Sequence, residues 1–243
     1  MEPDQHFAVP RLANVYDAVE GARDDLDLYE AIAVEVGATR VLDIGCGTGT
    51  LACRLAALGM AVTGLDPAAA SLAVARAKPG ADAVSWVCGP AIDSPGLDAD
   101  LVTMTGNVAQ VFVTDDDWSE ALAAVRGSLR PEGWFVFEAR DPERRAWLGW
   151  NPDETFEAVR LADGSVVETW VEVTDVEGPL VSFVSWFRFG DGDVLTSTST
   201  LRFRDRADVE GSLESAGLIL QDVRDAPDRP GQEFVYMSRR PAV

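Results

Sequence analysis

The stretch from Val41 to Leu51 constrains this chain more than any other, because it reads as an apolar strand, a glycine-rich turn and a helix start. Its turn contains Gly45, Gly47 and Gly49, which lack a Cβ and can therefore reach positive φ and let a ligand lie against the backbone. The helix that follows points unpaired N–H groups toward the turn. Asp43 stands near the end of the strand, at the edge where ligands bind in open α/β sheets. The stretch therefore predicts a ligand site at that edge.

The spacing of this turn separates two classes of cofactor. A dinucleotide fingerprint requires Gly or Ala at the position of Thr50. The carboxylate of Asp43 would disfavour a pyrophosphate but would attract a cationic or amine-bearing ligand. A nicotinamide oxidoreductase is therefore disfavoured, and a ligand-binding turn is preferred over a glycine turn that binds nothing.

Residues Asp43 to Gly49 resemble the glycine-rich motif of the class I S-adenosylmethionine-dependent methyltransferases. The resemblance extends over residues 8–138 and from 206 to the end, and it is greatest toward small-molecule methyltransferases of bacterial secondary metabolism. Amino-sugar N-methyltransferases are similar in that they also have an antiparallel insertion after the fifth strand. The resemblance implies S-adenosylmethionine as cofactor and S-adenosylhomocysteine as product, with contacts from Asp43, Gly45, Cys46, Gly47 and Gly49.

Composition limits what this chain of 243 residues binds. The chain has 41 acidic and 20 basic side chains, and therefore a formal charge of −21. Because such a charge repels phosphate backbones, we do not expect a nucleic-acid partner. Cys46, Cys53 and Cys88 have neither disulfide nor metal-ligand spacing. The single histidine, His6, stands in a terminus expected to be mobile, so no metal site is predicted. No membrane span or signal peptide is evident, so we expect a cytoplasmic monomer or homodimer without membrane contact.

Strands alternate with helices along most of the chain, which predicts an α/β fold with helices on both faces of the sheet. With the resemblance, this implies a Rossmann-like seven-stranded methyltransferase sheet whose seventh strand is antiparallel. Strands are expected at 41–44, 61–65, 84–88, 101–105, 134–138, 218–224 and 233–238. Helices are expected at 7–20, from Asp24 or Asp25 to 36, and at 51–58, 68–77, 118–129 and 206–216.

The pattern changes between residues 143 and 205, where period-two alternation and turn residues predict an antiparallel β insertion with strands at 166–176, 180–189 and 194–204. Its tryptophans are expected to form the core of that sheet more readily than a substrate box. We therefore predict N-terminal helices (1–37) that cover the cofactor, a core (38–142 and 206–243), and an insertion (143–205) that serves as a substrate lid or a dimer surface.

Two segments are candidates for the nucleoside half of the cofactor. Asp66 ends the second strand, where a carboxylate can accept hydrogen bonds from both ribose hydroxyls; it is alternatively a cap for the next helix. Family members commonly have an acidic residue after the third strand, but this chain has proline there. The adenine is therefore expected to meet Pro67 and the backbone of Ala91 and Ile92, with Asp93 as a weaker candidate.

Polar groups also follow the fourth and fifth strands. The resemblance implies that Thr105 and Gly106 pass the methionine half of the cofactor, and that Asn107 faces the substrate. Asn107 alternatively caps a helix start. Glu138, at the end of the fifth strand, could orient an amine or act as a base, and Arg140 could equally form an ion pair with a flanking carboxylate.

The N-terminal segment contributes two further candidates through the resemblance. Tyr16 would lie near the reacting sulfonium, as a catalytic and cofactor-binding residue, although it also lies on the apolar face of its helix. Arg23 could hold the methionine carboxylate of the cofactor.

These observations predict methyl transfer from S-adenosylmethionine to a small molecule, at nitrogen, oxygen or carbon. The alternative is a non-catalytic S-adenosylmethionine-binding protein that uses its β insertion as an interaction module. An open pocket at the strand ends would favour the enzyme, whereas a pocket filled by side chains would favour the binding module.

Overall fold

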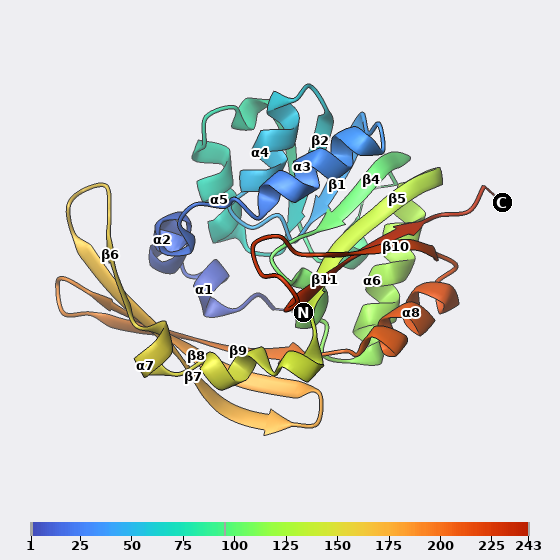
Figure 1. Cartoon of the computed structure of the whole chain (residues 1–243). Coiled ribbons are helices and arrows are strands. Elements are labelled where there is room, and N and C mark those ends of the chain that lie inside the picture. Colours follow the sequence, from blue (N-terminus) through green and yellow to red (C-terminus); the bar gives the residue numbers. More distant parts are fainter. Residues whose placement is uncertain (1, 95, 243) are drawn as a thin grey trace.

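Two β sheets organise the molecule (Figure 1). The computed structural model describes residues 2–94 and 96–242. An α/β body contains the larger sheet, and a smaller antiparallel sheet lies beside it, below the first two helices in Figure 1.

The larger sheet confirms the predicted seven strands and the antiparallel direction of the last one. Its order is β10-β11-β5-β4-β1-β2-β3, and β11 is antiparallel to both of its neighbours. The strands are β1 (Arg40–Ile44), β2 (Ala61–Asp66), β3 (Val84–Cys88), β4 (Ala99–Met104), β5 (Leu129–Arg140), β10 (Ile219–Asp225) and β11 (Glu233–Arg239). The carboxyl ends of β1, β2 and β4 therefore meet at one edge.

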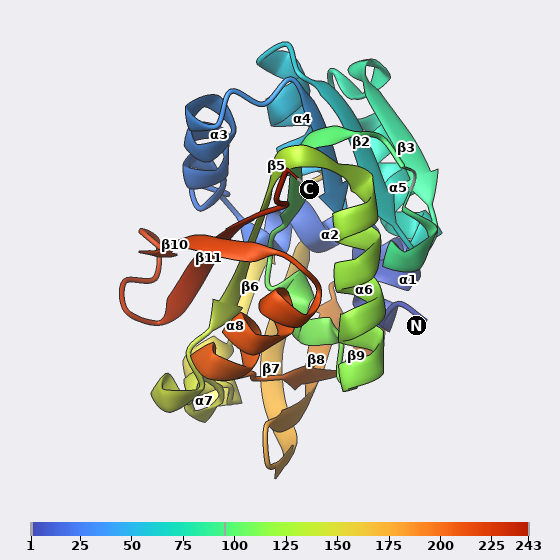
Figure 2. The same ribbon diagram turned by 90° about the vertical axis from the view of Figure 1, so that its right-hand side faces the viewer.

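Helices cover both faces of this sheet, as expected. On one face, α3 (Leu26–Glu35) and α4 (Thr50–Ala57) pack through a cluster that contains Leu26, Ile32 and Leu55. On the other, α6 (Asp115–Ser128) and α8 (Arg206–Ser215) lie side by side and share a cluster that contains Trp118 (Figure 2). The fifth helix, α5 (Ala69–Ala77), follows β2. Within the described ranges, no helix is long and apolar enough to cross a membrane.

Helix α6 starts three residues before the predicted position. Its cap is Thr114, whose hydroxyl accepts a hydrogen bond from the backbone N–H of Asp117 at 3.0 Å. The aspartates in its first turn suit the positive end of the helix dipole. Short 3-10 turns occur at η1 (Ala81–Ala83), η2 (Ala91–Asp93), η3 (Val108–Val111), η4 (Pro142–Arg144) and η5 (Ala146–Gly149).

The smaller sheet is the predicted antiparallel meander with one further strand. Its order is β6 (Glu157–Arg160), β7 (Val166–Glu177), β8 (Leu180–Phe189) and β9 (Val194–Arg202). The short helix α7 (Pro152–Thr155) precedes it. Neither β6 nor α7 was evident from periodicity, because four residues are too few to show a period. Its aromatic residues pack on one another, as the sequence favoured; Trp170 and Trp186 stack at 5.8 Å between ring centroids.

The N-terminal segment differs from the single helix predicted over 7–20. It forms α1 (Gln5–Ala8) and α2 (Pro10–Glu20), with Val9 extended between them. Pro10 causes this break, because proline disfavours the helical conformation in the residue before it. The expectation of a mobile terminus is also wrong. The backbone N–H of His6 donates to Ser197 Oγ at 2.9 Å, and its ring lies 4.7 Å from that of Phe187.

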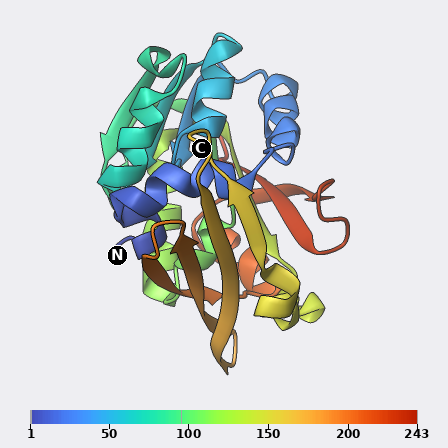
Figure 3. The ribbon, with the colours of Figure 1, turned by 90° about the vertical axis from the view of Figure 1, so that its left-hand side faces the viewer.

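A small apolar cluster joins α2 to the smaller sheet. Leu12 and Val15 of α2 pack against Val167, Phe187 and Phe189, and all five side chains are buried. Figure 3 shows the smaller sheet and the N-terminal helices on the same side of the molecule. The cluster therefore fixes the N-terminal helices and the insertion relative to each other.

Leu12→Ala should lower the free energy of unfolding by about 2–5 kcal/mol, because it opens a void in a cluster that has few other members. Val34→Ala, at a position that is 63% exposed on α3, should change it by less than about 0.5 kcal/mol. Urea denaturation of both variants checks this. Equal stabilities for the two variants would contradict the packing described for Leu12.

Candidate cofactor and substrate cavity

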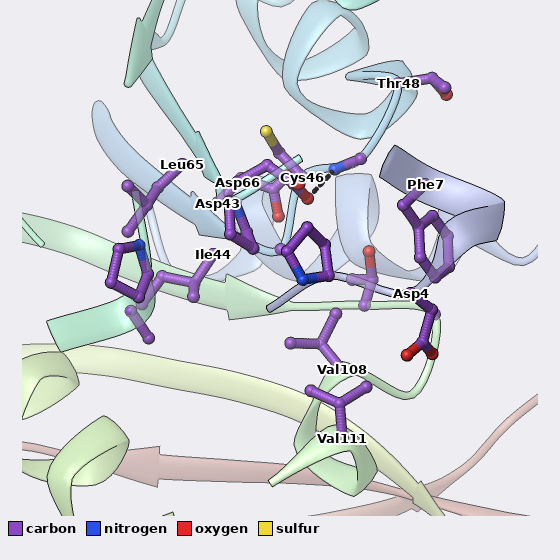
Figure 4. A pocket seen from close by; sticks show the side chains of 18 of the residues that line it. Asp4, Phe7, Asp43, Ile44, Cys46, Thr48, Leu65, Asp66, Val108 and Val111 are labelled. Carbon is purple, nitrogen blue, oxygen red and sulfur yellow. Dashed lines mark hydrogen bonds between the residues drawn. The ribbon is translucent and has the colours of Figure 1, made fainter. Parts of the chain in front are cut away.

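A cavity of about 500 Å³ lies at the carboxyl ends of β1, β2 and β4 (Figure 4). Residues from the glycine turn and the strand ends line it on one side, and residues from the N-terminus and β9 line it on the other. The predicted residues among them are Tyr16, Arg23, Asp43, Gly45, Cys46, Gly47, Asp66, Pro67, Ala91, Thr105 and Gly106. The structure thus brings most of the predicted cofactor residues around one space.

Gly47 presents bare backbone to the cavity. Its φ is +53°, and a Cβ built on it would meet no other atom within 4 Å. Gly49 serves a different purpose and does not line the cavity. A Cβ at Gly49 would collide with the ring of Trp86 and would lie 2.9 Å from the Cβ of Ala75. The prediction that Gly49 contacts the ligand is therefore corrected: it allows the turn to pack on the helix and strand beneath it.

Asp66 holds the glycine turn against the end of β2. The backbone N–H of Gly47 donates to Asp66 Oδ2 at 2.8 Å, and that of Ala68 donates to Oδ1 at 2.7 Å. Asp66 faces the cavity while Ala68 occupies the cap position of α5. Burial raises the pKa of Asp66, although the two N–H donors oppose this.

Asp43 lies deeper, at 1% exposure, beneath the same turn. The hydroxyl of Thr103 on the neighbouring strand β4 donates to Asp43 Oδ1 at 2.8 Å. Burial raises the pKa of Asp43 to about 7. A cationic group entering the cavity would favour the ionised form of this carboxyl.

Tyr16 and Arg23 reach the cavity from the N-terminal segment. Burial raises the pKa of the Tyr16 phenol, so its hydroxyl stays protonated near neutral pH. Arg23 forms an ion pair with Asp25, with Nη2 and Oδ2 2.8 Å apart. Asp25 therefore pairs with Arg23 and makes no side-chain capping hydrogen bond to α3.

A set of polar contacts that the sequence did not reveal connects α2 to the glycine turn; we call it the Asp17–Lys78 latch. The Thr48 hydroxyl donates to Asp17 Oδ1 at 2.5 Å, and Lys78 Nζ lies 2.8 Å from Asp17 Oδ2. The same ammonium donates to Thr50 Oγ1 at 2.7 Å. Nothing in the spacing of these residues could have indicated the latch, although Lys78 is the only lysine of the chain.

The placement of Glu138 at the ligand is corrected by the structure. Glu138 is buried and is absent from the cavity lining. Its Oε1 accepts the backbone N–H groups of Gly106 and Asn107 at 2.7 and 3.0 Å, and its Oε2 accepts the hydroxyl of Tyr29. Glu138 therefore supports the turn after β4 from behind.

The expected roles of four other residues are also corrected. Ile92 is 57% exposed and, like Asp93, is absent from the cavity lining. Asn107 points away from the cavity, donates to Glu233 Oε1 at 3.3 Å and makes no capping hydrogen bond. Arg140 forms its ion pair with Glu233, Nε to Oε1 3.4 Å, instead of with a flanking carboxylate.

Sequence reasoning missed the residues on the far wall of the cavity. Asp4 and Phe7 come from the N-terminal segment, Val111 and Phe112 follow β4, and β9 contributes residues 198–200. Only the folded chain brings these segments together. Among the residues that the structure describes, no group of side chains has the arrangement of a metal site.

Glu138→Gln should change the pH dependence of stability. Burial, together with nearby Glu233, raises the pKa of Glu138 to about 7 from 4.5. The folded state then keeps a proton that the unfolded chain releases, so this contribution to stability is present below pH 4.5 and is lost as the pH rises to 7. Between these values, stability should shift in favour of the variant. Urea denaturation against pH, with exposed Glu157→Gln as control, checks this; parallel curves for wild type and Glu138→Gln would contradict it.

Comparisons with known proteins agree with this geometry. Residues 41–133 match the family described as a methyltransferase domain. A protein of Geobacillus sp. strain WCH70 that bears a methyltransferase name is 55% identical over 105 residues, which are 42% of each chain. A methyltransferase of Bacillus licheniformis is 33% identical over 133 residues, or 51% of this chain and 62% of its own. The matched stretches cover less than two thirds of these curated relatives.

Solved structures match nearly the whole chain. The CcbJ methyltransferase from Streptomyces caelestis has a TM-score of 0.80 and 24% identity, covering 99% of this chain and all of its own. CalS10, an amino pentose methyltransferase from Micromonospora echinaspora solved with S-adenosylmethionine bound, has a TM-score of 0.72 and 21% identity, covering 93% and 95%. Residues 41–133 therefore match a methyltransferase domain, and the chain as a whole shares the Rossmann-like fold of these solved methyltransferases.

Proposed function

We propose that this protein transfers the methyl group of S-adenosylmethionine to a small-molecule acceptor. The observation that carries the proposal is the extent of the cavity. It begins at the glycine turn and Asp66 and continues, as one space, to the N-terminal segment and β9. A cofactor at the turn and an acceptor at the far wall would therefore occupy the same continuous space.

The residues present fit the cofactor. Gly47 leaves room for a ligand directly against the backbone. The carboxylate of Asp66 faces the cavity, where it would accept hydrogen bonds from ribose hydroxyls. Asp43 lies where it would favour the ammonium group of the methionine half, and Arg23 where it would favour the carboxylate. When bound, S-adenosylmethionine supplies a methyl group on a sulfonium, which needs little further activation.

The protein contributes to the reaction by positioning the cofactor and the acceptor and by removing water from between them. The Asp17–Lys78 latch holds α2, and with it Tyr16, over the turn. The protonated Tyr16 hydroxyl can donate one hydrogen bond in the cavity. Glu138 is not placed to act as a base, because it does not reach the cavity. The accepting atom is nitrogen, oxygen or carbon.

The domains are proposed to divide the work as the sequence suggested. Residues 1–37 would cover the cofactor, residues 38–142 and 206–243 would bind it, and residues 143–205 would select the acceptor. Support comes from β9, which contributes residues 198–200 to the cavity. An acceptor of the kind used in secondary metabolism is consistent with the similarity to CalS10, an amino pentose methyltransferase.

Mass spectrometry with methyl-labelled S-adenosylmethionine and a panel of small amines, alcohols and carbon acids tests the proposal. We expect labelled product from at least one member, with stoichiometric S-adenosylhomocysteine. Calorimetry should also show that S-adenosylhomocysteine binds and that NAD does not. Binding of NAD in preference to S-adenosylhomocysteine would contradict the proposal.

Gly47→Leu should abolish binding of S-adenosylhomocysteine without unfolding the protein, because the new side chain would project into the cavity. Gly59→Leu is a matched control: Gly59 also has positive φ and open space, but it lies outside the cavity. Each variant should lose roughly 1–3 kcal/mol of stability from backbone strain. Calorimetric binding that survives in Gly47→Leu would place the cofactor elsewhere.

Asp66→Ala should weaken S-adenosylhomocysteine binding by about 1–3 kcal/mol, the range for hydrogen bonds to a charged group. Asp82→Ala, in the remote turn η1, should leave the affinity unchanged. Isothermal titration of both variants measures the difference. An unchanged affinity in Asp66→Ala would limit Asp66 to holding the Gly47 and Ala68 backbone.

A further inference from the structure

The far wall of the cavity contains a carboxylate that the cofactor contacts do not use. Asp4, from the N-terminal segment, lines the cavity beside Phe7 and Val111. In Figure 4, Asp4 and Phe7 lie on the side of the cavity away from Asp43 and Asp66. Asp4 is therefore placed for whatever occupies the acceptor end.

One oxygen of this carboxylate is engaged and the other is available. The hydroxyl of Ser199 on β9 donates to Asp4 Oδ2 at 2.6 Å and fixes the side chain. Within the described parts of the chain, Oδ1 accepts no hydrogen bond, and no basic side chain pairs with Asp4. Burial raises the pKa of this carboxyl, as expected for an anion without a counter-ion.

The surrounding wall offers no compensating charge. Arg23 is the one basic residue among the described lining residues, and its ion pair is with Asp25 and not with Asp4. Phe7 and Val111 contribute apolar surface to the lining, the hydroxyl residues 198–200 contribute polar surface, and the other carboxylates away from the glycine turn, Glu2 and Asp117, add only negative charge. A half-buried carboxylate in such surroundings attracts a cation more strongly than it would in water.

We propose that Asp4 binds a protonated amine of the methyl acceptor and thereby restricts the acceptor to amine-bearing small molecules. This rests on the proposed function, because it assigns the acceptor end of the same cavity. An ammonium group offers three donors and a full positive charge, so it matches the open oxygen of Asp4. A neutral acceptor of equal shape would leave the carboxylate uncompensated and would therefore be rejected.

The experiment compares two probes of matched shape, benzylamine and benzyl alcohol, by calorimetry on the protein saturated with S-adenosylhomocysteine. We expect benzylamine to bind roughly ten- to a hundredfold more tightly than benzyl alcohol, from one charge-assisted hydrogen bond. Asp4→Asn, which keeps a group that can accept from Ser199, should abolish this preference. Asp175→Asn, which removes the same charge from an exposed position of β7, should preserve it.

A second variant keeps the proposal testable if Asp4→Asn does not fold. Ser199→Ala retains the carboxylate but frees its side chain, so the preference for benzylamine should fall and not vanish. Equal affinities for the two probes in the wild type, or an unchanged preference in Asp4→Asn, would overturn the assignment of Asp4. Failure of S-adenosylhomocysteine to bind would instead overturn the proposed function, and the two failures are therefore distinguishable.

Discussion

Bare backbone at Gly47 is the constraint on which the rest of the site depends. The chain must leave the buried strand β1 and enter α4 within a few residues, and it does so with positive φ at successive glycines. On one side of the turn there is no room for a ligand, because Gly49 packs on Trp86. The other side is open, because nothing faces Gly47. The hydrogen bond from Gly47 to Asp66 then ties the open side to the end of β2.

The rest of the cavity is assembled from distant parts of the chain around that turn. Asp17 joins α2 to Thr48 and Lys78, the hydroxyl of Ser71 donates to the carbonyl of Phe7 at 3.0 Å, and Asp4 accepts from Ser199. Carboxylates accept several of these hydrogen bonds, and Glu138 holds the turn after β4 in the same way. Part of the chain's large acidic excess thus serves to hold backbone N–H groups and hydroxyls in place around the cavity.

The sequence predicted the sheet and the near wall of the cavity well, because both depend on local pattern. Hydrophobic periodicity located the seven strands, and the turn from Gly45 to Gly47 together with Asp66 marked the ligand edge. It misplaced Glu138, because a strand-end position does not reveal which backbone groups a carboxylate will meet. It could not place Asp4 in the cavity, since that contact joins residues 195 positions apart. Helix α1 and strand β6 were not predicted as separate elements, because each is only four residues long.

A crystal structure of the protein with S-adenosylhomocysteine tests the central claim most directly. We predict that the ligand lies against the Gly47 backbone, with its ribose hydroxyls at Asp66 and its sulfur directed toward Tyr16. The wall formed by Asp4, Phe7 and β9 should remain open for an acceptor. A ligand bound outside this cavity, or one that fills it as far as Asp4, would contradict the account.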